Sequence, residues 1–336
     1  MAATIRDITR MTGLSLATVS KYLNGGNVLP KNRELIEDAI RELHYEVNEV
    51  ARGLATNRTR TVGILTHRLD NMFASTIITE IEDILRRNDY GTIVCGCRGD
   101  EALEKESLRF LLGKRVDGII AIPTSQSSAY LEPALQRNIP VVLIDRIFHD
   151  RDLDCVLVDN EKASRDAVRM LIDRGHTRIG IICGEEHIYT AKKRFDGYIR
   201  AHREAGLTVI PDYVQQGPME EVEYGYRAMK RLLSLGLPPT AVFLTNYELT
   251  LGGIIALNEK GVRVPDDLSL IGFDNMMLSR VVKPRPWMVA QPMDEIAARA
   301  AGLLLERLRG ERAEGGVCVM LDTQMHEGDS IRGWCG

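Results

Sequence analysis

The stretch at residues 14–26, LSLATVSKYLNGG, gathers side chains that can bind a phosphate backbone. Hydroxyl residues compete with a helix for backbone hydrogen bonds, so Ser15, Thr18 and Ser20 contribute little to helix formation. On a helix surface, hydroxyls and N-terminal N–H groups bind phosphate oxygens, and Lys21 reaches a phosphate or a guanine edge. The pattern fits a DNA-binding helix and a small helical bundle with solvated hydroxyls equally well.

Short helices and no strand are predicted for the segment that carries this stretch. Thr4 has Asp7 three residues later, the spacing of a capping box, and Gly13 marks the end of the first helix. Ser15 caps the second helix, which ends at two glycines, and a third amphipathic stretch follows. Two helices joined by a glycine turn predict an all-α three-helix helix-turn-helix head at residues 1–46.

The second predicted helix has an apolar face and a polar face. Val19 and Leu23 fall on the side that packs against the other two helices. Leu16, Ala17 and Lys21 fall on the outer side, next to the hydroxyl groups. Small side chains allow a duplex to approach closely, and the two apolar ones can contact thymine methyl groups. The outer side is therefore the candidate base-reading surface.

From residue 61 the sequence alternates short apolar runs, such as TVGILT and PVVLID, with amphipathic segments of helix length. Strands that alternate with helices predict parallel sheets covered on both faces. The pattern runs twice, so we expect an α/β core of two doubly wound parallel-sheet lobes, with a ligand cleft at the carboxyl ends of their strands. Within the core at 61–336, the expected first lobe spans about 61–159 plus 290–318, and the second about 160–289 plus 319–336.

Composition and charge are those of an ordinary globular protein. The 336 residues are 44% hydrophobic, without an apolar run near the roughly 20 residues that cross a bilayer and without a signal-peptide pattern, so we expect a cytoplasmic protein. The first 60 residues hold nine Lys and Arg against seven Asp and Glu, whereas the whole chain has a net charge of -4. A slightly basic end on an acidic body is compatible with nucleic-acid contact at that end.

Catalytic and metal-binding patterns are missing from the sequence. No G-x-G-x-x-G follows the first predicted strand, no P-loop occurs, and the seven histidines form no evident group with a serine or cysteine nucleophile. The six cysteines lack C-x-x-C spacing, which predicts reduced, structural thiols. We therefore expect no enzyme activity, no metal and no cofactor.

Several motifs together resemble the LacI/GalR family of bacterial transcription regulators. TIRDITRMTGLSLATVSKYLNGG and HYEVNEVARGLATNRTRTVGIL are similar to its N-terminal signature, and LLGKRVDGII, KGVRVPDDLSLIGFDN and QPMDEIAARAAGLLLERL continue the likeness. The resemblance implies a repressor with a head, a hinge and a two-lobe core that forms a homodimer and holds an effector. It implies base contacts from Leu16, Ala17 and Lys21, and phosphate contacts from Thr4, Ser15, Thr18 and Ser20.

The hinge expected at residues 47–60 is a short helix. Asn48 can cap it, and its interior Gly53 costs about 1 kcal/mol, so the helix is unstable until DNA holds it. By the family resemblance, Leu54 enters the minor groove and kinks a base step. The alternative for Leu54 is a linker residue that packs on the core. Val47 stands where the family usually has proline.

The resemblance also implies an effector site in the cleft, at Phe73, Asp145, Arg194, Asn246 and Asp274. These side chains suit a polyol, because carboxylates and an amide group can form hydrogen bonds with adjacent hydroxyls. An aromatic ring can cover the C–H side of a sugar. A strand-end carboxylate that is satisfied by a helix N-terminus is the alternative for either aspartate.

Several neighbouring positions depart from the family pattern. Met219 stands near a position where an aromatic is common, and Tyr247 stands where aspartate is typical. Arg68, Lys192 and Lys193 would favour an anionic ligand if they faced the cleft, and otherwise form solvated surface. The expected effector is a sugar or sugar derivative whose binding changes the angle between the lobes and the separation of the two hinges. The alternative function, a solute-binding protein of the same core fold, would need an export signal and no head.

Overall fold

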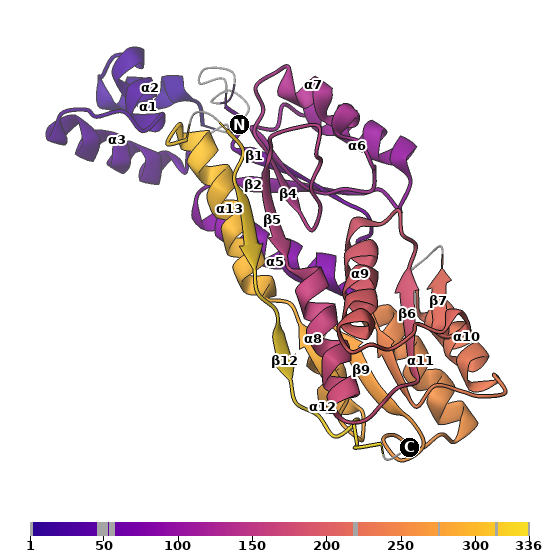
Figure 1. The fold of residues 1–336 in the computed structure, drawn as a ribbon. Helices are drawn as coiled ribbons and strands as arrows, with labels where there is room; N and C mark the ends of the chain where they lie inside the picture. The colour runs from indigo at the N-terminus through magenta and orange to yellow at the C-terminus, as the bar shows by residue number, and fades with distance from the viewer. Residues whose placement is uncertain are drawn as a thin grey trace.

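The computed structural model describes residues 3–45, 53, 58–217, 221–274, 276–312 and 315–334. Figure 1 shows an all-helical head at the N-terminus and two α/β lobes, with the C-terminus at the end of the second lobe that lies away from the head. The expected combination of a helical head with a two-lobe α/β core is confirmed.

Three helices build the head: α1 (Ile5–Thr12), α2 (Leu16–Leu23) and α3 (Pro30–Leu43). The predicted capping box is present, with Thr4 N and Thr4 Oγ1 both donating to Asp7 Oδ2, at 2.9 and 2.7 Å. The head's core consists of a few buried side chains drawn from all three helices. These are Ile8, Val19, Ile36 and Ala39. Because this core is small, each of its members accounts for a large share of the head's stability.

The first lobe is a six-stranded parallel sheet in the order β11-β5-β4-β3-β1-β2. One face is covered by α5 (Met72–Arg87) and α13 (Met293–Arg309), and the other by α6 (Glu101–Gly113), η1 (Ser128–Leu131) and α7 (Glu132–Leu135). Successive strand residues alternate between the faces, so Ile64 packs under α5 and Leu65 under α6. The strands are β1 (Thr61–Thr66), β2 (Gly91–Gly96), β3 (Gly118–Ile122), β4 (Val141–Ile144), β5 (Asp154–Val158) and β11 (Cys318–Leu321).

The second lobe repeats the arrangement with the order β12-β10-β9-β8-β6-β7. Helices α8 (Asn160–Asp173) and α9 (Tyr189–Glu204) cover one face, and α10 (Val222–Leu233) and α11 (Tyr247–Lys260) cover the other. The strands are β6 (Ile179–Gly184), β7 (Val214–Gly217), β8 (Ala241–Leu244), β9 (Ser269–Phe273), β10 (Trp287–Ala290) and β12 (Gln324–His326), and two short helices, η2 (Pro211–Tyr213) and α12 (Met276–Val281), complete the lobe.

The edges of the sheets differ in detail from the sequence expectation. β7 is polar (VQQG) and lies at the edge beside β6, where backbone pairing rather than an apolar pattern defines the strand. β12 pairs antiparallel with β10, so the second sheet is parallel except at this edge. β11 pairs with β5 from Cys318 to Leu321, so the chain stays in the first sheet beyond the boundary expected near residue 318.

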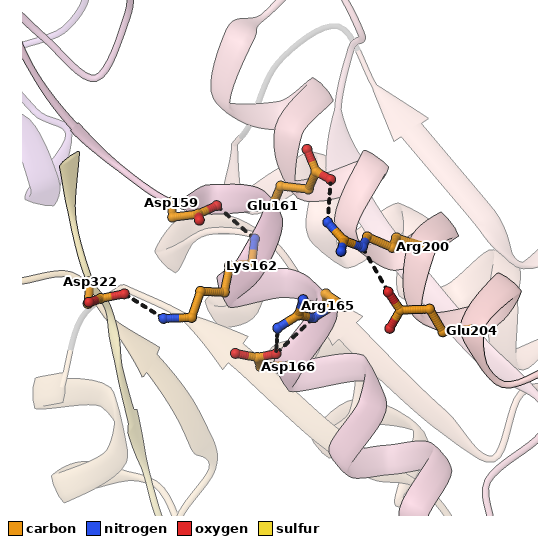
Figure 2. Close-up of polar contacts among 8 residues, drawn as sticks. All are labelled: Asp159, Glu161, Lys162, Arg165, Asp166, Arg200, Glu204 and Asp322. Carbon is orange, nitrogen blue, oxygen red and sulfur yellow. Dashed lines mark hydrogen bonds and ion pairs between the residues drawn. The ribbon is translucent and has the colours of Figure 1, made fainter. Parts of the chain in front are cut away.

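In the described part of the chain, crossings between the lobes follow β5, β10 and β11. Two of these crossings are joined by exposed polar contacts (Figure 2). Asp159 Oδ1 accepts from Lys162 N at 2.9 Å at the start of α8, and Lys162 Nζ donates to Asp322 Oδ1 at 2.6 Å. On the α9 side of the same helix, Arg200 Nη1 donates to Glu161 Oε1 at 3.3 Å. The crossings are therefore linked at the junction of the lobes by one solvent-screened pair, Lys162–Asp322, as well as by the chain itself.

Candidate functional site

Helix α2 carries the predicted base-reading residues on one exposed surface. Leu16 is 52% exposed, and Ser15, Ala17 and Lys21 are exposed as well, whereas Val19 is fully buried. The two faces of α2 are therefore those predicted from the sequence. The contacts that Leu16, Ala17 and Lys21 would make with bases stay a prediction.

The hydroxyl groups at the helix starts also hold the helices in place. Ser15 Oγ accepts from Thr18 N at 3.2 Å and shares a hydrogen bond with Thr18 Oγ1 at 2.9 Å, so one of these two hydroxyl hydrogens is left to donate outward. Thr4 directs both its N–H and its O–H to Asp7. In this conformation Thr4 keeps neither donor free for a phosphate, whereas backbone N–H groups of the first turn of α1 can still donate to one.

The glycines after α2 position Lys21. Gly25 has a φ of +80°, which L side chains rarely adopt, and it ends the helix. Gly26 N donates to Lys21 O at 2.8 Å, and a Cβ at Gly26 would lie 2.6 Å from Lys21 Cγ. The absence of a side chain at Gly26 thus leaves room for the aliphatic stem of the lysine. Ser20 Oγ accepts from Asn24 Nδ2 at 3.3 Å and keeps its own hydrogen for an outside acceptor.

Three of the predicted site residues lie outside the described residues: Asn48 and Leu54 in the hinge, and Met219 in the cleft. The predicted minor-groove contact of Leu54 therefore stays a prediction.

Between the lobes, the carboxyl ends of the two sheets enclose a cavity of about 630 Å³. The predicted pocket residues that the structure describes all line it. These are Phe73, Asp145, Arg194, Asn246, Tyr247 and Asp274. Asp145 follows β4 in the first lobe, and Asp274 follows β9 in the second. The sheet topology, rather than closeness in sequence, brings these side chains together.

Arg194 is held rigidly in the wall of the cavity. The side chain is buried, its Nε donates to Asn160 Oδ1 at 2.7 Å, and its Nη1 donates to Thr245 O at 2.6 Å. Its guanidinium carbon lies 3.9 Å from the ring centroid of Phe273, a cation–π distance. Three fixed contacts leave the guanidinium in one orientation, so it can act as a preorganised anchor for ligand oxygens.

The two aspartates differ in how well the protein satisfies them. Burial raises the pKa of Asp274, although Arg194, the Gln291 amide and the backbone N–H of Tyr247 favour its charged form. Gln291 Nε2 donates to Asp274 Oδ1 at 2.5 Å. Burial also raises the pKa of Asp145 to about 7, against the lowering effect of Arg194. The alternative of a carboxylate capped by a helix N-terminus therefore applies in part to Asp274, because Tyr247 is the first residue of α11. No such cap on Asp145 is found among the described residues.

Asn246 has a structural role beside any role in binding. It is the N-cap of α11, and its Oδ1 accepts from Leu249 N at 2.8 Å. Tyr247, the next residue, begins the helix and lines the cavity. The departure from the family pattern at Tyr247 thus brings an aromatic ring, instead of a carboxylate, to this wall.

The mouth of the cavity is spanned by direct contacts between the lobes. Arg68 Nη1 donates to Glu221 Oε1 at 2.5 Å, and Asn71 Nδ2 donates to Glu248 Oε1 at 3.0 Å. Asp70 binds the other side of Arg68, with Nη2 to Oδ2 at 2.7 Å. Arg68 therefore does line the cleft, but as an ion-paired residue rather than as an open cation.

The lysines considered with Arg68 form part of the surface of α9. Lys192 Nζ pairs with Asp196 Oδ1 at 3.2 Å and Lys193 Nζ with Glu161 Oε2 at 3.4 Å, and neither lysine is among the side chains that line the cavity. The solvated-surface alternative thus holds for both lysines.

Two family models match the chain. A model described as "Bacterial regulatory proteins, lacI family" matches residues 4–48, and a periplasmic binding protein-like domain matches residues 168–331. Catabolite control protein A of Priestia megaterium is 38% identical over 320 residues, which covers 94% of this chain and 96% of that protein. The chain belongs to the LacI family. It is accordingly a transcriptional repressor of that family and not an enzyme.

Further relatives agree with the LacI-family assignment. The HTH-type transcriptional repressor PurR of Pasteurella multocida is 36% identical over 95% of this chain and 96% of its own length. A solved complex of the transcriptional regulator CelR with cellobiose has a TM-score of 0.73 at 27% identity, covering 98% of this chain and 99% of that one. A lac repressor dimer bound to operator has a TM-score of 0.87 and covers 99% of this chain and 100% of that one. At 24% identity, the last likeness supports the fold alone.

Several cavity residues of this LacI-family chain were missed by the sequence analysis. Most of them follow a strand of the first sheet, and one follows β10 at a crossing between the lobes. These residues are His67, Arg98, Thr124, Arg146 and Gln291. The signal that could have found them is the rule that ligands bind outside the carboxyl ends of parallel strands. Over the described residues, no helix combines the length and the apolar character that a membrane span needs.

Proposed function

We propose that this protein is a cytoplasmic homodimer that represses transcription at a near-palindromic operator and that releases or gains the operator when a small ligand binds between its lobes. Each protomer supplies one head, and the two-fold axis of the dimer sets the spacing of the half-sites. The ligand is a sugar or sugar derivative. The observation that carries the proposal is the pairing of an exposed α2 face with a cavity lined by both lobes.

The head supports the DNA-binding part of the proposal. Leu16, Ala17 and Lys21 offer two apolar contacts and one flexible charge, so α2 discriminates bases weakly by itself. In this proposal, the hinge residues Asn48 and Leu54 provide the additional selectivity by folding in the minor groove. Thr18 and Ser20 supply the outward hydroxyl donors for phosphate.

The cleft supports the ligand-binding part. Asp145, Asp274 and the Gln291 carbonyl oxygen present acceptors, and Arg194 presents donors, as adjacent sugar hydroxyls require. Gln291 Oε1 is buried and has no hydrogen-bond partner among the described residues, so a ligand hydroxyl can satisfy it. Ribose is bound in one LacI family structure of 27% identity, from Enterococcus faecium, which has a TM-score of 0.74 and covers 82% of this chain and all of that one.

The experiment that tests DNA binding starts from an operator selected out of a random DNA library with the full chain. Lys21→Ala should weaken binding to the selected operator about tenfold and reduce the slope of log affinity against log salt by about 1. Lys105→Ala removes the same charge from an exposed position on α6 and serves as the matched control. Equal affinities and slopes for Lys21→Ala and the control would contradict the proposed role of α2.

The ligand response is tested with the same operator. A panel of sugars and sugar derivatives is screened by thermal unfolding, because a ligand that binds the folded state raises its Tm. A ligand that raises the Tm should also change operator affinity by about 5- to 150-fold, the usual range of coupling between two sites. A ligand that binds in the cleft without any effect on operator affinity would refute the coupling.

A further inference from the structure

The cavity between the lobes has two chemically different ends. At the second-lobe end, the positive charge of Arg194 acts on the carboxylate of Asp274, so cation and anion compensate each other. At the first-lobe end, the lining includes His67, Arg98 and Arg146, which come after β1, β2 and β4. Three cationic or hydrogen-bond donor side chains therefore lie where the strands of the first sheet end, beside the carboxylates of Asp70 and Asp145.

The arginines at the first-lobe end differ in their partners. Arg146 Nη1 donates to two backbone carbonyl oxygens at 2.7 and 3.0 Å, which fixes the side chain. The carboxylates of Asp145 and Glu104 act on its charge from nearby, but neither forms an ion pair with it within the described residues. Arg98 forms no hydrogen bond or ion pair with any described residue. Arg68, by contrast, is engaged by two carboxylates. Arg98 and Arg146 are thus the cations of this end that remain available to an outside anion.

The surroundings of His67 are positive. Burial first, and then the charges of Arg146 and Arg68, lower the pKa of His67 to about 4, against the raising effect of Asp70. The ring is therefore neutral near pH 7 and offers one N–H donor. Gly99 N donates to His67 O at 3.1 Å, which places the loop that carries Arg98 beside His67. An anion at this point would therefore meet a positive field and a neutral donor.

A buried hydroxyl at the same end has no partner. Thr124 lines the cavity, and its Oγ1 makes no hydrogen bond to any described residue. An incoming acceptor would remove the cost of this unsatisfied group. Glu104, beneath the same loop, accepts from the backbone N–H groups of Thr124 and Ser125 at 2.9 and 2.8 Å, and it is not among the side chains that line the cavity.

We propose that the ligand of this cleft carries an acidic group, a phosphate ester or a carboxylate, that binds between Arg98 and Arg146 and accepts from the Thr124 hydroxyl. The hydroxyl-rich part of the ligand then lies toward Asp145 and Arg194. Hydrogen bonds between charged partners are roughly twice as strong as neutral ones, so the acidic group decides which ligand binds. This inference rests on the proposed function of the cleft as a ligand site, and it narrows the ligand to sugar phosphates or sugar acids.

The test uses the full chain without DNA. Thermal unfolding is followed in inorganic phosphate and in chloride at matched ionic strength, and then with ribose, ribose 5-phosphate and ribonate. Phosphate stabilises proteins in general by exclusion from their surface, so the decisive quantity is the difference between variants. Arg98→Gln should lose most of the phosphate-dependent rise in Tm, whereas Arg109→Gln, the same change at an exposed position on α6, should keep it.

The sugar series distinguishes the source of the acidic group. At least one of the two acids should bind at least tenfold more tightly than ribose, and Arg98→Gln should reduce this preference at least tenfold. A phosphate-dependent rise in Tm that is equal in the wild type, Arg98→Gln and Arg109→Gln overturns the inference. This outcome does not depend on whether ribose is the right sugar, because the phosphate experiment contains no sugar. Binding of ribose as tightly as of both acids overturns it as well.

Thr124→Val provides an independent variant that keeps the side-chain shape. Removing a buried hydroxyl without a partner should leave the Tm of the unliganded protein unchanged or higher, while the phosphate-dependent rise becomes smaller. If Thr124 had a purely structural role, Thr124→Val would lower the Tm of the unliganded protein and leave the phosphate-dependent rise unchanged. Because these measurements contain no operator, their failure counts against the acidic ligand, whereas a ligand-independent operator affinity counts against the proposed function.

Discussion

The head and the cleft hold their chemistry in opposite ways. In the head, one helix of eight residues, α2, presents the contact side chains, and four fully buried residues support the three helices. In the cleft, the contact residues come from several strands and helices of both lobes, and two large cores hold those elements in place. The comparison teaches that the head is specified by local sequence and depends on a small core, whereas the cleft is specified by topology and its fold is robust to the loss of one contact.

The largest expected effect separates the two regions by stability. Ile36→Ala should destabilise the head by about 2 to 5 kcal/mol, because the side chain is fully buried in a core too small to relax around the loss. Operator binding should fall with head folding, while ligand binding to the cleft stays unchanged. Calorimetry should show that the unfolding transition of the head moves to lower temperature in Ile36→Ala, while the transition of the core stays in place. Leu29→Ala, at a side chain that is 70% exposed, is the control. A loss of ligand binding in Ile36→Ala would show that the two regions are not independent.

The second prediction concerns the cleft and uses pH. Burial raises the pKa of Asp145 to about 7, above its unfolded value near 4, so the stabilisation that its proton provides is complete below about pH 4 and is lost as the pH rises through 7. Asp145→Asn does not titrate and should raise the free energy of unfolding near pH 7.5 by about 2 kcal/mol, after allowance for partial solvent exposure, with little change at pH 4.

Unfolding free energies measured from pH 4 to 8 check this prediction. Asp152→Asn changes an exposed carboxylate in the same lobe and should leave the pH dependence as in the wild type. If Asp145→Asn and the wild type lose stability in parallel over this range, Asp145 is not the group that titrates.

The third prediction returns to the head and tests the fit between Gly26 and Lys21. A Cβ at Gly26 would lie 2.6 Å from Lys21 Cγ and 2.9 Å from Lys21 O, so Gly26→Ala should move the lysine and weaken operator binding about three- to tenfold. In a Lys21→Ala background the same change should cost less, because the displaced side chain is already gone. Gly236→Ala has open space around its Cβ and is the control. Strictly additive effects of Gly26→Ala and Lys21→Ala would refute the coupling.

The contrast between the head and the cleft also explains how much of the structure the sequence could predict. The helices of the head, the capping box of Thr4 and Asp7 and the exposed face of Leu16 were predictable, because caps and helical spacing act within a few residues. The alternation of strands and helices also predicted both lobes and their cleft. The polar edge strand β7 was not predictable, because pairing with β6, rather than its own side chains, defines it.

The residues of the cleft were predictable only where a family motif named them. Asp145 and Arg194 were found in this way, and the structure places both in the cavity wall. Arg98 and Thr124 were missed, because their significance depends on which strand ends face the same cavity. For Arg68 the sequence allows both a place in the cleft and a place on the surface. The side chain lines the cavity and pairs with carboxylates of both lobes. A contact between lobes is a tertiary fact that no local pattern contains.

The smallest expected effect concerns that contact between the lobes. The Arg68–Glu221 pair is about 40% exposed on either side, and exposed pairs contribute about 0.2 to 1 kcal/mol, so Arg68→Gln should leave the Tm nearly unchanged. The same energy acts on the equilibrium between open and closed lobes, where it corresponds to a change of about 1.5- to 5-fold. Small-angle scattering without ligand should therefore show a larger radius of gyration for Arg68→Gln. Arg263→Gln removes a comparable exposed pair, Arg263–Asp267, that lies within one lobe, and its scattering should match the wild type. Identical scattering of both variants would mean that chain crossings and apolar packing, rather than this pair, keep the lobes closed.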